Sequence, residues 1–109
     1  MNWNTLESSE QLSHITHESN EQPVLLFKHS TRCSISSAAL ARLERSWKED
    51  SGIKPYYLDL LANKPLSAEI AAAFGVEHQS PQALLISNGK CVYTESHMGI
   101  DVSDMLSML

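Results

Sequence analysis

The sequence predicts an α/β domain in which helices cover both faces of a central mixed β-sheet of four to five strands. Short apolar runs alternate along the chain with segments whose apolar residues recur at helical spacing, the pattern of strands alternating with amphipathic helices. The last apolar run is interrupted by Asn88-Gly89, the strongest short signal for a β-hairpin. A chain of 109 residues is long enough for one hydrophobic core. We therefore expect a single domain over residues 1–109.

The N-terminal part of the chain is predicted to form a helix followed by a buried strand. Ser8 is followed three residues later by Gln11, which is the pattern of a capping box and predicts a helix over residues 8–19. The apolar run over residues 23–28 begins with a proline and suits a central strand. A short strand around Trp3 would bring the sheet to five strands.

A long amphipathic helix is predicted over residues 33–50, followed by a strand over residues 54–61 that is rich in aromatic and aliphatic side chains. Gly52 stands where a left-handed C-cap of this helix would lie. The apolar positions of the helix recur at every fourth residue and are Ile35, Ala39, Leu43 and Trp47.

Another helix is predicted over residues 63–75, because both of its ends carry a signal. Asn63 is in a cap position, Pro65 lies in the first turn, and Gly75 marks the end. Its apolar stripe is formed by Leu66, Ile70 and Phe74.

The end of the chain is predicted to form a hairpin over residues 82–96 and a helix over residues 101–109 that begins at the cap residue Asp101. The preceding strand-helix-strand order gives a parallel pair through a right-handed crossover, and the hairpin adds antiparallel neighbours. This mixed sheet with helices on both faces is the thioredoxin architecture.

Charge and composition exclude several kinds of partner. The net charge is −5 and no cluster of Lys and Arg is present, so we expect neither a nucleic acid nor a membrane as a partner. The N-terminus has no secretory signal and no apolar run is long enough to span a bilayer, so we expect a cytoplasmic location. The five histidines show no metal-binding spacing and there are only two cysteines, so no metal site is expected.

Cys33 is the candidate nucleophile, because it stands where the central strand gives way to a helix. Helix N-termini and nearby positive charge lower the pKa of cysteines, and Arg32 and His29 could supply such charge. Ser36, three residues further on, shares a helix face with the sulfur and can donate a hydrogen bond to it, yet it cannot resolve a disulfide. We therefore expect Cys33 to attack a mixed disulfide and to wait for an external thiol. The alternative is a cysteine that only fills a helix start.

Ser80 and Pro81 precede the first strand of the hairpin, which in a thioredoxin sheet begins beside the strand that leads to Cys33. A proline at this place indicates a strand start or a cis peptide bond, with backbone groups free to pair with an extended substrate. An ordinary turn proline is the alternative. His97, at the end of the hairpin, returns to the same end of the sheet, where it borders the site or lies on the surface.

The second cysteine, Cys91, directly follows the hairpin turn and so lies at the opposite end of the strand from Pro81. Strand geometry places it on the order of 20 Å from Cys33, beyond the ~7 Å Cα separation that a disulfide allows. Cys91 is interpreted as a structural or incidental thiol.

Three segments carry a resemblance to a known family. They are FKHSTRCSIS at 27–36, VEHQSPQALLISNGK at 76–90 and SH at 96–97, and they resemble the monothiol bacilliredoxins of the bacillithiol system, the YtxJ-like branch of the thioredoxin superfamily. Where that family typically has T-C-P-I-S, this chain has Arg32 before the cysteine and Ser34 after it. Phe27 stands where thioredoxins usually keep a buried acid.

The resemblance implies an enzyme that removes bacillithiol from S-bacillithiolated proteins, with Cys33 transiently thiolated and then cleared by bacillithiol or another low-molecular-weight thiol. Bacillithiol is thus expected as a co-substrate, with no bound cofactor. The residues expected to contact the substrate are Thr31, Ser34, Ser80, Pro81, His29 and His97. Two other functions remain open: an iron–sulfur cluster carrier similar to the monothiol glutaredoxins, and a non-catalytic binding module with the same fold.

Overall fold

A five-stranded mixed sheet runs through the centre of the computed structural model, which describes residues 1–109. Its spatial order is β1-β3-β2-β4-β5; β1, β3 and β2 are parallel, whereas β4 and β5 are antiparallel to their neighbours. The strands are β1 (Asn4–Thr5), β2 (Val24–His29), β3 (Lys54–Asp59), β4 (Gln82–Ser87) and β5 (Lys90–Ser96). The predicted mixed sheet is confirmed, and the strand near Trp3 brings it to five strands.

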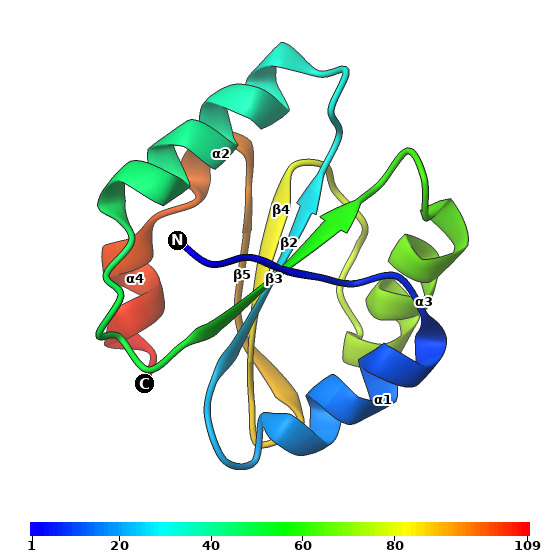
Figure 1. Ribbon diagram of the computed structural model, residues 1–109, viewed down its shortest axis with the longest axis vertical. Coiled ribbons are helices and arrows are strands. Elements are labelled where there is room, and N and C mark those ends of the chain that lie inside the picture. The colour runs from blue at the N-terminus through cyan, green and yellow to red at the C-terminus, as the bar shows by residue number, and fades with distance from the viewer.

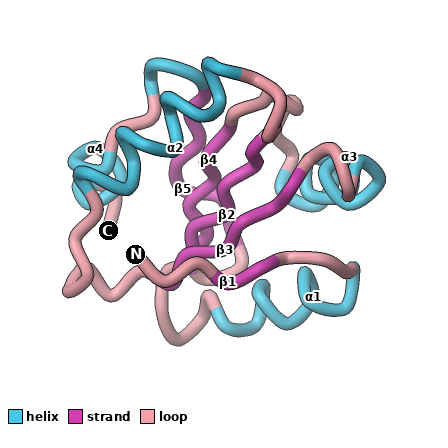
Figure 2. Tube along the Cα trace, turned by 45° about the horizontal axis from the view of Figure 1, so that its top comes forward, coloured by secondary structure: helices cyan, strands magenta, loops and turns pink.

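Helices cover both faces of this sheet, as Figure 1 shows. One face is covered by α1 (Ser9–Glu18) and α3 (Lys64–Phe74), and the other by α2 (Ser34–Ser46) and α4 (Val102–Ser107), with a single 3₁₀ turn, η1 (His97–Gly99), before α4. Figure 2 shows β1 beside β3 at one edge of the sheet. No helix has the length and apolar character needed to cross a bilayer.

The central strand β2 is buried along its whole length and serves both layers of the core. Val24 and Leu26 pack into the cluster under α1 and α3, and Leu25 and Phe27 pack into the cluster under α2 and α4. A strand covered on both faces is expected to be apolar throughout. The last two residues of β2, Lys28 and His29, are buried although they are polar.

Most element ends lie where local signals predicted them. Ser8 and Gln11 form a complete capping box, and Asp101 accepts hydrogen bonds from the N–H groups of Ser103 and Asp104. Gly75 ends α3 with a φ of 64°, and the hairpin turn has positive φ angles of 52° at Asn88 and 76° at Gly89. These positions need a left-handed backbone, which glycine and asparagine adopt at least cost.

Three predicted ends were too late. The helix predicted to reach residue 50 ends at Ser46, because Trp47 turns into an extended conformation (ψ 139°) and packs against the core between α2 and the sheet. Gly52, with a φ of 79°, therefore belongs to the turn before β3 and is not a helix cap. β3 ends at Asp59, whose carboxylate accepts a hydrogen bond from the N–H of Leu61 (3.1 Å). The last helix ends at Ser107, not at residue 109.

Leu84 belongs to β4, and its side chain is fully buried in the core under α1 and α3. Its truncation therefore measures what this part of the core contributes to stability. We expect Leu84→Ala to lower the free energy of unfolding by about 2–5 kcal/mol, since it removes apolar contacts and leaves a cavity. Leu109→Ala is the matched control, because Leu109 is 51% exposed. Urea unfolding of both variants measures the difference, and equal midpoints would contradict this description of the core.

Candidate active site

Cys33 is the N-cap residue of α2, one position before the first turn in which it was predicted. Its side chain is half-buried, and its N–H donates to the carbonyl of Ser30 (3.1 Å). The next three N–H groups, those of residues 34–36, find no acceptor within the protein. Such unpaired N–H groups at a helix start can donate to an anion. The backbone around Cys33 therefore suits a thiolate.

Ser36 faces inward from the first turn of α2 and is fully buried. Its Oγ lies 2.7 Å from Nδ1 of His29 and accepts a hydrogen bond from the N–H of Ser30 (3.0 Å). The predicted hydrogen bond from this hydroxyl to the sulfur of Cys33 is not formed. The N–H of Ser30 is partly buried and the imidazole of His29 is buried, and leaving a buried polar group unpaired costs about 1–3 kcal/mol. Ser36 therefore ties the loop before Cys33 to the end of β2.

His29 is too buried to serve as the cation expected beside the sulfur. Only 4% of it is exposed, and its ring lies against the rings of Phe27 and Tyr57. Burial lowers the pKa of His29, and the carboxylates of Asp59 and Glu44 and the contact with Ser36 oppose this only in part. The imidazole is thus neutral at neutral pH. His29 was expected to contact the substrate. In the structure it is buried instead and holds the hydroxyl of Ser36.

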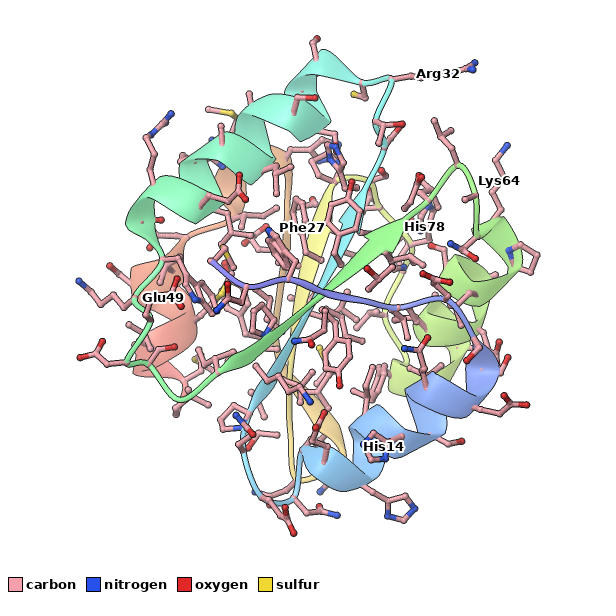
Figure 3. The ribbon with its side chains drawn as sticks, viewed as in Figure 1. His14, Phe27, Arg32, Glu49, Lys64 and His78 are labelled. Atoms are coloured by element: carbon pink, nitrogen blue, oxygen red, sulfur yellow. The ribbon has the colours of Figure 1, made fainter.

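Arg32 and the residues next to Cys33 are exposed. In Figure 3 the side chain of Arg32 extends away from the fold near the start of α2, and it forms no ion pair. Thr31 and Ser34 are exposed on either side of the cysteine. Ile35, predicted as part of the apolar stripe of the helix, is 53% exposed because Ser36 occupies the inward position. The thiol is therefore surrounded by accessible hydroxyl and apolar groups.

The segment before β4 has the cis peptide bond that was one of the two predicted alternatives, between Ser80 and Pro81. The backbone N–H and C=O of Ser80 make no hydrogen bond within the protein, and its Oγ is buried without a partner. A substrate would thus meet the backbone of Ser80, not its hydroxyl. Because Lys28 of β2 pairs with Gln82 of β4, this segment lies at the same end of the sheet as Cys33.

His97 borders this segment through its backbone. Its N–H donates to the carbonyl of Pro81 (3.1 Å), and its own carbonyl accepts a hydrogen bond from the guanidinium of Arg42 in α2 (3.0 Å). Arg42 thereby links α2 to η1, a role that no local sequence signal indicates, since the two residues are 55 positions apart. Met98, next to His97, is 75% exposed.

Cys91 lies away from this end of the sheet. It pairs with Ile86 near the hairpin turn, both cysteines are free, and the thiol of Cys91 donates to the carbonyl of Tyr93 (3.2 Å). Burial raises the pKa of the Cys91 thiol. A half-buried, protonated thiol at this position packs against the core and is a poor nucleophile.

The buried imidazole predicts a dependence of stability on pH. His29 has a folded-state pKa below its ordinary value of 6.5, so the stability it contributes is present above about pH 6.5 and is lost as the pH falls through the lowered pKa. We expect urea midpoints to fall more steeply between pH 8 and pH 5 for the wild type than for His29→Asn, whose amide does not titrate. Parallel pH profiles of the two proteins would show that His29 does not carry this dependence.

Comparisons with known proteins agree with this geometry. The chain matches the family model described as "Monothiol bacilliredoxin BrxC" over residues 4–105. It is similar to a solved structure described as a candidate oxidoreductase with a thioredoxin fold, with 32% identity and a TM-score of 0.82 over 95% of this chain and 90% of that chain.

Two thioredoxins share the fold at lower identity. Thioredoxin from Trypanosoma brucei brucei is 15% identical with a TM-score of 0.74, over 98% of this chain and 87% of that chain. Thioredoxin from Fasciola hepatica is 17% identical with a TM-score of 0.69, over 85% of each chain. The predicted thioredoxin-like α/β fold is confirmed. The family match covers nearly the whole chain and includes Cys33, and this protein therefore belongs to the monothiol bacilliredoxin family, with a thiol redox role.

Proposed function

We propose that this protein is a monothiol disulfide reductase that removes bacillithiol, or a similar low-molecular-weight thiol, from protein mixed disulfides, with Cys33 as the nucleophile. The observation that carries the proposal is the position of Cys33 at the unpaired N–H groups of α2, with a serine in place of a second cysteine. Membership of the bacilliredoxin family supports the choice of thiol.

The exchange takes place in two steps. The Cys33 thiolate attacks the low-molecular-weight sulfur of the mixed disulfide; that disulfide breaks, and the cysteine of the target protein leaves as a thiolate that takes a proton from water. Cys33 now carries the small thiol. A second molecule of small thiol, as its thiolate, attacks that disulfide and releases the Cys33 thiolate. The target cysteine is reduced and the second small thiol is oxidised, so that the two small-thiol sulfurs leave together as one symmetrical disulfide.

Several features of the surface support a protein as the substrate of the first step. The free N–H and C=O of Ser80 can pair with an extended segment of the target. Ile35 and Met98 are exposed apolar side chains on α2 and η1, the elements next to Cys33 and Pro81. These side chains can add apolar contacts to a protein bound at this end of the sheet. Thr31 and Ser34 add exposed hydroxyl groups close to the sulfur.

Cys33→Ser should abolish transfer, because no other thiol of the chain lies at this site. The measurement is intact-protein mass spectrometry after incubation with a bacillithiolated model protein. The wild type should gain the mass of one bacillithiol and restore the target. Cys91→Ser is the control and should behave as the wild type, because the Cys91 thiol is half-buried at the far end of β4. Transfer by Cys33→Ser, or none by the wild type, would refute the proposal.

Ser36→Cys should convert the one-thiol exchange into a two-thiol exchange. The new thiol would stand three residues after Cys33, in the first turn of the helix that Cys33 caps, where it can attack the mixed disulfide on Cys33 and expel the small thiol. Without added thiol, we expect the wild type to keep its adduct. The variant should lose the adduct and form a disulfide between residues 33 and 36, which leaves it two hydrogens lighter than its reduced form. Ser36→Ala, which adds no thiol, is the control. An adduct equally stable in all three proteins would contradict the assigned geometry.

A further inference from the structure

Lys28 is a buried cation without an anionic partner. Its side chain is 0% exposed, and no carboxylate of the chain forms a salt bridge with it. Its Nζ donates to the carbonyl of Ser67 (3.3 Å) and to Nδ1 of His78 (3.2 Å). Burial lowers the pKa of Lys28 to about 8, so the ammonium form still dominates at neutral pH. Buried charges are costly unless they are paired, so this one indicates an anion supplied from outside the chain.

The contact with Lys28 fixes the tautomer of His78. An ammonium group can only donate hydrogen bonds, and so Nδ1 of His78 must be the acceptor. The hydroxyl of Ser67 lies 3.1 Å from the same nitrogen. Burial and the charge of Lys28 lower the pKa of His78, which keeps the ring neutral. The proton of the ring is therefore on Nε2, at the edge opposite Lys28, where it is free to be donated.

His78 lines a pocket of about 330 Å³ beside α3. The walls are formed by Leu60, Lys64, Ser67, Ala68 and His78. Figure 3 shows His78 and Lys64 on the α3 side of the sheet. The lining is mostly apolar and suits a carbon skeleton. Lys64 and His78, two of the five lining residues, carry nitrogen donors that suit a carboxylate at its edge. The charge of Lys28, behind His78, strengthens the attraction for an anion.

This pocket lies at the same end of the sheet as the thiol, on the opposite face from α2. The N–H of Leu60 donates to the carbonyl of His29 (2.9 Å), and Lys28 pairs with Gln82, which directly follows Pro81. His78 is separated from Pro81 by only two residues. The segment with the cis peptide bond thus has Cys33 on one side and the pocket on the other.

We propose that the pocket beside Lys28 and His78 binds a carboxylate of the low-molecular-weight thiol while its sulfur is exchanged at Cys33. The inference rests on the proposed function for the identity of the ligand, but not for the existence of a carboxylate site. Lys28 is a positioning residue that acts through His78, whereas His78 and Lys64 contact the carboxylate.

The first arm of the test measures binding without any redox step. Succinate is titrated into ¹⁵N-labelled Cys33→Ser protein and followed by amide chemical shifts. We expect saturable shifts at Ser67 and His78 that are lost in Lys28→Met and weakened in Lys64→Gln, both made in the Cys33→Ser protein. Lys90→Gln in the same background changes the net charge equally at the far end of the sheet and is the control. Lys64 is exposed, so its substitution leaves the core intact. Succinate shifts in Lys64→Gln equal to those in the parent Cys33→Ser protein would overturn the site.

The second arm distinguishes the source of the carboxylate. Glutathione and its diethyl ester are compared as reductants of the mixed disulfide on Cys33. We expect glutathione to be faster by about two- to fivefold, as a single ion pair near the surface allows. This preference should vanish in Lys28→Met, become smaller in Lys64→Gln and persist in Lys90→Gln. Succinate binding without this preference would assign the pocket to a carboxylate of the target protein and overturn the proposal. Succinate binding without any transfer at Cys33 would refute the proposed function alone.

Discussion

The arrangement around Cys33 depends on the hydrogen bonds of one buried hydroxyl. Oγ of Ser36 joins the first turn of α2 to His29 at the end of β2 and to the N–H of Ser30 in the intervening loop. The loop that carries Cys33 is therefore held at both ends. Where a two-thiol enzyme has its second sulfur, this chain has a hydroxyl whose hydrogen bonds support the backbone, which gives the one-thiol mechanism a structural basis.

The sequence predicts elements best where a local signal marks their ends. Ser8 with Gln11, Gly75 and the Asn88-Gly89 turn lie where they were predicted, because capping and positive-φ preferences act over a few residues. The end of α2 was missed because Trp47 leaves the helix for a tertiary contact. The register shift between Leu85 and Ile86 in the β4–β5 pair has no local signal either.

The site residues, too, were predictable where a local signal exists and not where a tertiary contact decides. The predicted helix start gives the position of Cys33, and the proline before a strand indicates that Ser80 and Pro81 lie near the site. The direction of the Ser36 hydroxyl was not predictable, because its partners are groups of β2 and the following loop that the fold brings close. The sequence places Lys28 at the end of an apolar strand and within a segment of the family resemblance, but it does not indicate its partners Ser67 and His78, which are 39 and 50 residues away in the chain.

The end of β2 separates two electrostatic environments around one thiol. Successive side chains of a strand point to opposite faces, so His29 faces α2 and Lys28 faces α3. Burial acts on both in the same direction, against the charged form, but it neutralises the imidazole and leaves the lysine mostly charged because their ordinary pKa values differ by about four. The loop that holds Cys33 therefore rests on a neutral, fully hydrogen-bonded support. The positive charge lies on the other side of Pro81, in a protein whose net charge is −5, where it can attract an anion without disturbing the support of the sulfur.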